Sequence, residues 1–273
     1  MNITHKRFIV SILLTLLLIS IVIKAPPFLG AGVVVFVVGV ALLEFYKLVE
    51  KKGIIISRKF GIMLGCLIPL LVYLNSLFKV SSPATWEIVF TIIICFIIFG
   101  VQFTRKDSQQ AIAVLSTTIF GILYISWPLS FFVKFLYMDK GRWLILFLLL
   151  VIKLGDVGAY LVGTKFGRHS LIKRISPNKS KEGTIAGLIF SIVASLLLGK
   201  IYLEMKTFEG IVLGLLLGGL GQLGDLCESL LKRDCQVKDS GNIFPGLGGM
   251  LDLIDSVIFA VPLFYLYVSF FLK

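Results

Sequence analysis

Charged side chains are scarce in this chain of 273 residues. Asp, Glu, Lys and Arg together make up 15% of it, where a soluble domain carries roughly a quarter. Hydrophobic residues reach 58%, and the mean hydropathy is +0.99. This composition excludes an ordinary soluble domain and favours a protein embedded in a membrane.

Metal-binding and nucleophilic side chains are few as well. The four cysteines show no CxxC spacing, which argues against a zinc site or a disulfide framework. Two histidines, His5 and His169, are too few for a histidine-based metal centre or a Ser-His-Asp triad. A bound metal would therefore be held by carboxylates, which favours Mg2+. The pattern GxxxxGK[ST] is also missing, which argues against a P-loop ATPase.

Long apolar runs recur along the chain, and about 20 residues suffice to cross a hydrocarbon core of about 30 Å. Alternating ten-residue strands are missing, so we expect an all-α, polytopic transmembrane helical bundle rather than a β-barrel. About nine spans are predicted, at residues 8–24, 28–46, 60–79, 86–103, 110–133, 143–163, 184–203, 208–231 and 251–271. The first span lacks a small-residue cleavage site before Pro26, so we expect a retained helix and not a signal peptide.

The distribution of the basic residues along the chain explains the formal net charge of +12. If the N-terminus is cytoplasmic and nine spans alternate, most of the 27 Lys and Arg residues fall on the cytoplasmic side, as the positive-inside rule requires. They are dense in two loops on that side, within 164–183 and 232–250. The charge therefore indicates topology and an anionic lipid surface, and we expect no nucleic-acid partner.

Ionisable residues are nearly missing from the spans of the first 152 residues, where Glu44 lies near a span end. In the second half, Lys153 and Asp156 interrupt an apolar segment three residues apart, on one helical face. Two readings stay open. The residues form an ion pair that fixes helix packing, or they line a polar cavity in which Asp156 binds nucleotide or metal.

Glycines recur through residues 210–224, where small residues allow helices to approach closely. This segment runs into a polar stripe on one helical face, which consists of Asp225, Glu228, Ser229 and Lys232. Asp252 and Asp255 share a face at the start of the last span. Unpaired carboxylates are costly in apolar surroundings, so we expect these two acidic helix ends to face each other and to bind one or two divalent cations.

Basic residues and glycines lie between the two helix ends. The basic residues that would clamp phosphate charge are Lys232, Arg233 and Lys238. The glycines that precede the last helix are Gly246, Gly248 and Gly249. A glycine turn at a helix N-terminus can cradle phosphate oxygens with backbone N–H groups. The alternative of a solvated charged loop fits only residues 233–242.

In these residues the sequence resembles the phosphatidate cytidylyltransferases, also called CDP-diacylglycerol synthases. The C-terminal signature of that family reads approximately S-x-x-K-R-x4-K-D-x5-P-G-H-G-G-x-x-D-R-x-D. The matching residues are Ser229, Lys232, Arg233, Lys238, Asp239, Pro245, Gly246, Gly248, Gly249, Asp252 and Asp255. A second family block, D-x-x-A-Y-x-x-G-x-x-x-G-[RK] followed by I-S-P-x-K-[ST]-x-E-G, is similar to residues 156–183. The resemblance spans about 150–256.

The sequence departs from the signature at two positions. Leu247 stands where the family usually has His, and Leu253 stands where it usually has Arg. Every carboxylate and lysine of the signature is retained. The nucleophile of the family reaction is an already ionised phosphate oxygen, which needs no base. The resemblance therefore still implies an active enzyme.

The resemblance implies attack of a phosphatidate phosphate oxygen on the α-phosphorus of CTP, which gives CDP-diacylglycerol and pyrophosphate. The expected catalytic residues are Asp225, Lys232, Arg233, Lys238, Asp239, Asp252 and Asp255, with Asp225 and Asp252 as ligands of Mg2+. The expected substrate contacts are Asp156, Ser176, Lys179, Ser180, Glu182, Ser229, Gly246, Gly248 and Gly249.

The expected organisation follows from the same resemblance. Residues 1–140 would form membrane helices that anchor the protein and enclose the lipid, and residues 141–273 would form the catalytic helices. We expect CTP, phosphatidate and the lipid bilayer as partners, with a homodimer as an option. The expected location is the bacterial inner (plasma) membrane, with the active site facing the cytoplasm.

Three alternatives stay open. A CTP-dependent polyprenol kinase, or a cytidylyltransferase for ether-linked archaeal lipids, would share much of the chemistry. A transporter also tolerates buried Lys153 and Asp156, although it predicts pseudo-symmetric halves. An inactive homologue would be explained by Leu247 and Leu253.

Overall fold

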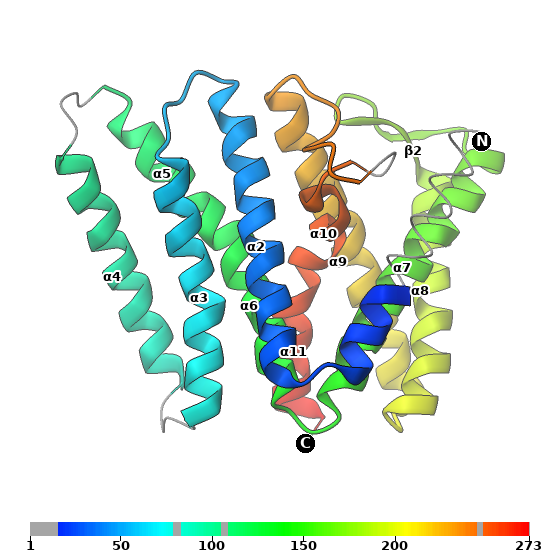
Figure 1. Ribbon diagram of the computed structural model, residues 1–273. Coiled ribbons are helices and arrows are strands. Elements are labelled where there is room, and N and C mark those ends of the chain that lie inside the picture. The colour runs from blue at the N-terminus through cyan, green and yellow to red at the C-terminus, as the bar shows by residue number, and fades with distance from the viewer. Residues whose placement is uncertain (1–15, 79–82, 105–108, 245–247, 273) are drawn as a thin grey trace.

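The computed structural model describes residues 16–78, 83–104, 109–244 and 248–272. Helices stand side by side in a bundle, and one short hairpin lies at the end opposite the C-terminus (Figure 1). The helices of the first half are α2 (Pro27–Glu50), α3 (Arg58–Phe78), α4 (Pro83–Phe103), α5 (Ala111–Gly121), the π-helix η1 (Ile122–Ser126) and α6 (Trp127–Leu136). The second half contains α7 (Gly141–Phe166), β1 (Ser170–Ile172), β2 (Ser176–Ser180), α8 (Lys181–Tyr202), α9 (Thr207–Asp234), α10 (Met250–Ile258) and α11 (Ala260–Phe271).

Seven helices of the described residues are long and apolar enough to cross a membrane. They are α2, α3, the continuous helix Ala111–Leu136, α7, α8, α9 and the helix Met250–Phe271. The all-α membrane bundle is confirmed, and each of the seven corresponds to a predicted span. This chain is an integral membrane protein.

The described residues contain about seven spans and not the predicted nine, because two predicted spans are not among the seven. Residues 86–103 lie in the 21-residue helix α4, whose described side chains begin at Val89, and α4 is not among the seven. Of the predicted span 8–24, residues 16–24 are helical, and residues 8–15 lie outside the described part of the chain.

Prolines explain the two irregular helices. Pro128 has no N–H, and its ring crowds the carbonyl of residue i−4; the wider π-helical turn Ile122–Ser126 directly precedes it. Pro262 likewise cannot donate to Ile258, and the last helix is interrupted at Phe259, between α10 and α11. Both helices, Ala111–Leu136 and Met250–Phe271, continue beyond these irregular turns.

Glycines bring α8, α9 and α10 close together. A Cβ atom on Gly214 would lie 2.5 Å from the Cα of Ile192 on α8, and one on Gly224 would lie 2.2 Å from the carbonyl oxygen of Asp255 on α10. Any larger residue would force the helices apart at these positions. The predicted packing role of residues 210–224 is confirmed, and it sets the distance between α9 and α10.

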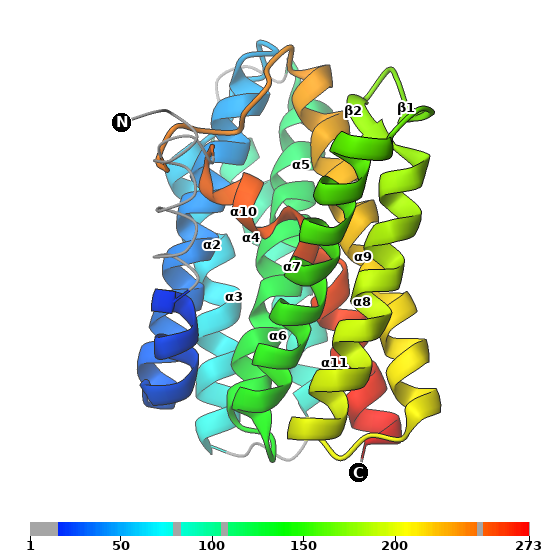
Figure 2. The same cartoon turned by 90° about the vertical axis from the view of Figure 1, so that its right-hand side faces the viewer.

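Two apolar clusters form the core. One joins α6, α7, α9 and α11 around Phe135, Phe147 and Phe264. The other joins α2, η1, α6 and α10 around Leu42, Ile125 and Leu251. The β1–β2 hairpin and the segment between α9 and α10 lie together at one end of the bundle (Figure 2). Because α2 packs on α10, the first half of the chain reaches the start of the last span.

Candidate active site

A cavity of about 520 Å³ lies near the hairpin, between α7, β2, α8, α9 and α10. Its charged lining residues are Lys153, Asp156, Lys179, Asp225, Lys232, Asp239, Asp252 and Asp255. Ser176 and Ser180 line it from β2. The structure therefore brings most of the predicted site residues to one place.

One ion pair joins the β1–β2 hairpin to α9. The ammonium of Lys179, on β2, contacts Oδ2 of Asp225, and the two side chains are 29% and 35% exposed. Ser229, one turn further along α9, donates a hydrogen bond of 3.5 Å to Oδ1 of Asp225. Ser180 caps α8 by accepting from the N–H of Gly183, which fixes the end of β2 beside the cavity.

A second, more deeply buried cation lies between two carboxylates. Lys232 forms ion pairs with Glu228, one turn earlier on α9, and with Oδ1 of Asp252 on α10 at 2.6 Å. The Glu228 side chain is fully buried, and those of Lys232 and Asp252 are nearly so. The predicted facing of the two acidic helix ends is confirmed, and Lys232 is what joins them.

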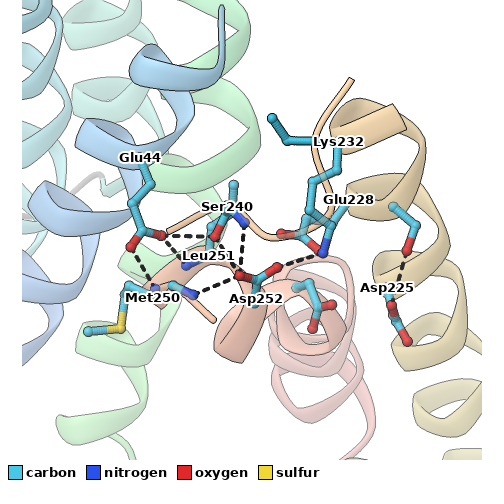
Figure 3. Close-up of polar contacts among 12 residues, drawn as sticks. Glu44, Asp225, Glu228, Lys232, Ser240, Met250, Leu251 and Asp252 are labelled. Atoms are coloured by element: carbon cyan, nitrogen blue, oxygen red, sulfur yellow. Dashed lines mark hydrogen bonds and ion pairs between the residues drawn. The ribbon is translucent and has the colours of Figure 1, made fainter. Parts of the chain in front are cut away.

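The other oxygen of Asp252 organises the start of α10 (Figure 3). It accepts hydrogen bonds from the N–H of Gly249 at 2.7 Å and from the N–H and hydroxyl of Ser240 at 3.0 and 2.8 Å. The sequence predicts that the Gly249 N–H binds a phosphate, but in this structure it donates to the Asp252 carboxylate.

Glu44 of α2 completes the same network. Its Oε1 accepts from the N–H of Met250 at 3.0 Å, and its Oε2 accepts from the N–H of Leu251 at 2.9 Å (Figure 3). The Ser240 hydroxyl lies 3.1 Å from Oε2 and shares its one proton between Glu44 and Asp252. Glu44 is 3% exposed. The sequence showed Glu44 only as an acid near a span end, and its partners could not be read from it.

Lys153 and Asp156 form an ion pair and also line the cavity, while binding of nucleotide or metal by Asp156 stays a prediction. Their charged groups lie 3.4 Å apart, and both residues line the cavity. Lys153 also donates to the Ser256 hydroxyl at 3.2 Å and to the carbonyl of Leu253 at 3.4 Å. The lysine thereby ties α7 to α10 and places a positive charge beside the position where the family signature has Arg.

The metal prediction can be compared with the donors present. Among the described residues, no three His, Cys, Asp or Glu side chains are arranged to hold a metal ion. Carboxylates nevertheless line the cavity from three helices, through Asp156, Asp225 and Asp255, and such oxygen donors suit Mg2+. The oxygens of Asp225 and Asp252 contact lysines or hydrogen-bond donors. The donor chemistry fits a hard cation if a lysine releases its carboxylate, and the assignment of Asp225 and Asp252 stays a prediction.

Several predicted residues lie outside the cavity lining. Arg233 donates to the carbonyls of Ile175 and Val237, so it joins the turn after α9 to the hairpin. Glu182 accepts from the backbone of Arg168 and contacts the His169 ring at 2.6 Å.

The remaining predicted positions belong to the segment before α10. Lys238 is exposed. Gly248 has φ +95, a conformation that favours glycine, and it pairs with Phe244. Gly246 and Leu247 lie outside the described residues. The positions of these residues do not test the substrate roles predicted for them, and each of these roles stays a prediction.

Comparisons with known proteins show which family this chain is similar to. The model of the family described as "Cytidylyltransferase family" matches residues 5–271. The phosphatidate cytidylyltransferase of Bacillus subtilis (strain 168) is 31% identical over 276 residues, which cover 97% of this chain and 98% of that protein. The phosphatidate cytidylyltransferase of Staphylococcus aureus (strain COL) is 34% identical over 246 residues, which cover 82% of this chain and 94% of that protein. The uncharacterized protein YnbB of Escherichia coli (strain K12) is 37% identical over 153 residues, 56% of this chain and 51% of that protein.

Proposed function

Because this chain belongs to the cytidylyltransferase family and is a nucleotidyltransferase, we propose that it transfers CMP from CTP to phosphatidate, forming CDP-diacylglycerol and pyrophosphate. One observation carries the proposal. A single cavity in a membrane bundle gathers three lysines and five aspartates, as a reaction between polyphosphate and a lipid phosphate requires.

The reaction needs alignment and charge neutralisation more than proton transfer. A phosphate oxygen of phosphatidate forms a new bond to the α-phosphorus of CTP. The bond from the α-phosphorus to the bridging oxygen of the β-phosphate breaks, and pyrophosphate carries that oxygen away. The attacking oxygen is already ionised, so no general base is required, and correct placement can supply a large part of the rate.

Two lysines are proposed to hold the phosphates. Lys179 and Lys232 each pair with an aspartate that lines the same cavity. We propose that the lysines turn to phosphate oxygens when substrate enters, which frees Asp225 and Asp252 for Mg2+. The cation would neutralise charge on attacking and leaving oxygens.

The cavity is proposed to face the cytoplasm, where CTP is available, from the plasma membrane of a bacterium. The bacterial relatives support the location. The basic hairpin, with Arg168, Lys173 and Arg174, lies at the cavity end of the bundle and supports the orientation through the positive-inside rule.

The decisive assay supplies the purified protein with either phosphatidate or polyprenol, with and without Mg2+, and with CTP labelled at the α-phosphate or, in a parallel reaction, at the γ-phosphate. Magnesium-dependent CDP-diacylglycerol, with label from the α-phosphate, is the expected product. A phosphorylated polyprenol would instead identify a kinase, and absence of any product would identify an inactive homologue. Light scattering on the same preparation tests the homodimer.

Orientation can be tested with single cysteines in a variant whose four native cysteines are replaced by alanine. Lys173→Cys lies in the hairpin, and Asp139→Cys lies at the opposite end, before α7. In bacterial spheroplasts, an impermeant maleimide should label Asp139→Cys directly and Lys173→Cys only after permeabilisation. The reverse pattern would contradict the proposed orientation.

A further inference from the structure

The start of α10 is held by two carboxylates from different parts of the chain. The first N–H groups of a helix have no partner within it. Asp252, in the first turn of α10, accepts from Gly249. The next two N–H groups, of Met250 and Leu251, donate to Glu44 on α2, 206 and 207 residues earlier in the chain.

The surroundings of Glu44 leave space for little else. A Cβ atom on Gly241 would lie 2.4 Å from Oε1 of Glu44, and one on Gly249 would lie 2.3 Å from Oε2. Glu44 is 3% exposed as a whole residue, and both of its carboxylate oxygens accept hydrogen bonds. Two glycines, two backbone amides and one hydroxyl therefore form a socket fitted to this side chain.

Ser240 connects the socket to the cavity. Its hydroxyl lies 3.1 Å from Oε2 of Glu44 and 2.8 Å from Oδ2 of Asp252. The other oxygen of Asp252 holds Lys232 at 2.6 Å. A movement at Glu44 would therefore shift the start of α10 and, through it, the aspartate and lysine that line the cavity.

We propose that Glu44 is a positioning residue of the active site, which acts through Ser240 and the first turn of α10 to orient Asp252 and Lys232. Glu44 does not line the cavity, so it need not touch substrate. For its effect on catalysis, the inference rests on the proposed function. It also gives the first half of the bundle a part in the chemistry beyond anchoring.

The central variant is Glu44→Gln, which keeps the shape but replaces one oxygen with an NH2 group that faces N–H donors. Misplacement of reacting groups by a fraction of an ångström to 1 Å can lower rates up to about 100-fold. We expect kcat per folded molecule to fall about 10- to 100-fold, while the KM for CTP changes less than about threefold. The matched control is Glu50→Gln, the same change on the same helix, at a residue that pairs with Arg58; its kcat should equal that of the unaltered protein.

A double-mutant cycle separates positioning from general destabilisation. If Glu44 acts through Ser240, the pair Glu44→Gln and Ser240→Ala should be clearly non-additive in kcat, because residues in one network couple. The pair Glu50→Gln and Ser240→Ala should be additive. Additive effects in the first pair, or a kcat loss that disappears after correction for the folded fraction, would overturn the proposal.

A second measurement does not depend on activity. Hydrogen–deuterium exchange of the amides at 249–251 should be faster in Glu44→Gln than in Glu50→Gln, since one of the two amides that donate to Glu44 loses its acceptor and the other donates to a neutral oxygen instead of a carboxylate. Unchanged exchange would overturn the proposal even if the enzyme is active. Absence of CDP-diacylglycerol from the unaltered protein, with faster exchange in Glu44→Gln, would reject the proposed function and keep the structural link alone, so the positioning role would fall with it.

Discussion

Every charged residue that lines the cavity lies between Lys153 and Asp255, whereas the helices before residue 140 contribute one buried carboxylate to its support, Glu44. The second half carries charges that pair across α7, β2, α9 and α10. The first half carries a side chain that caps a helix of the second. The difference teaches that the chemistry of this site lies in one stretch of sequence, while its geometry needs both halves.

The largest effect on activity is expected at Asp225, in the half of the chain that carries the charged cavity lining. In Asp225→Asn, Lys179 loses the charge of its partner and the proposed cation loses a ligand. We expect kcat for CDP-diacylglycerol to fall about 100-fold or more, with little change in thermal unfolding because this pair is about one third exposed. Activity near that of the unaltered protein would remove Asp225 from the catalytic set.

Lys232 and Lys52 allow the two halves of the chain to be compared in their contribution to stability. Lys232 lies between two buried carboxylates, so Lys232→Met should cost about 3–5 kcal/mol of unfolding free energy. Lys52 of the first half pairs with Asp234, and these side chains are 39% and 60% exposed. Lys52→Met should cost less than about 1 kcal/mol. Thermal or denaturant unfolding in detergent measures both, and equal losses would contradict the burial difference.

Helix spacing offers a smaller effect with a control on the same helix. In Gly224→Ala the new methyl group meets the carbonyl of Asp255, whereas a methyl group at Gly219 would meet no atom of the described residues within 4 Å beyond its own stretch of helix. We expect Gly224→Ala to destabilise by about 1–3 kcal/mol and to lower activity by displacing α10. Gly219→Ala should leave activity unchanged and stabilise by about 0.5–1 kcal/mol through helix propensity. Similar results for the two variants would show that close packing at Gly224 does not matter.

The smallest effect is expected at the end of the bundle away from the cavity. Lys140 pairs there with Glu204 at 2.8 Å, and both side chains are well exposed. Lys140→Gln should leave kcat and KM within about twofold of the unaltered protein. A larger loss in the same CTP assay would mean that the two ends are coupled, contrary to the comparison.

Sequence reasoning located the charged lining because those residues sit at fixed helical spacings in two dense segments. The stripe from Asp225 to Lys232 shares one face of α9, and Asp252 follows a glycine turn that returns the chain to it. Such local periodicity survives into the structure. It also placed Lys153 and Asp156 together, since three residues are less than one helical turn.

What the sequence could not give were the partners set by tertiary packing. Glu44 shows no local pattern, because its acceptor role depends on α10 lying beside α2. The span count also differed from the prediction, since the predicted spans 8–24 and 86–103 are not among the seven found in the described residues. The pairing of Lys232 with two carboxylates was likewise hidden, because a basic residue near a cytoplasmic loop was expected to be free for phosphate.

The distance along the chain between Glu44 and Met250 has a consequence for biosynthesis. At roughly 5–20 residues per second, the 206 residues that separate them take about 10 to 40 s to be made. During that time the carboxylate of α2 is in the membrane without the amides that will bind it. Glu44 lies six residues before the last residue of α2. Before α10 is made, its side chain can therefore extend toward the lipid headgroups. The hydrogen bonds to Glu44 can therefore form only after the last helix has been synthesised and has packed against α2.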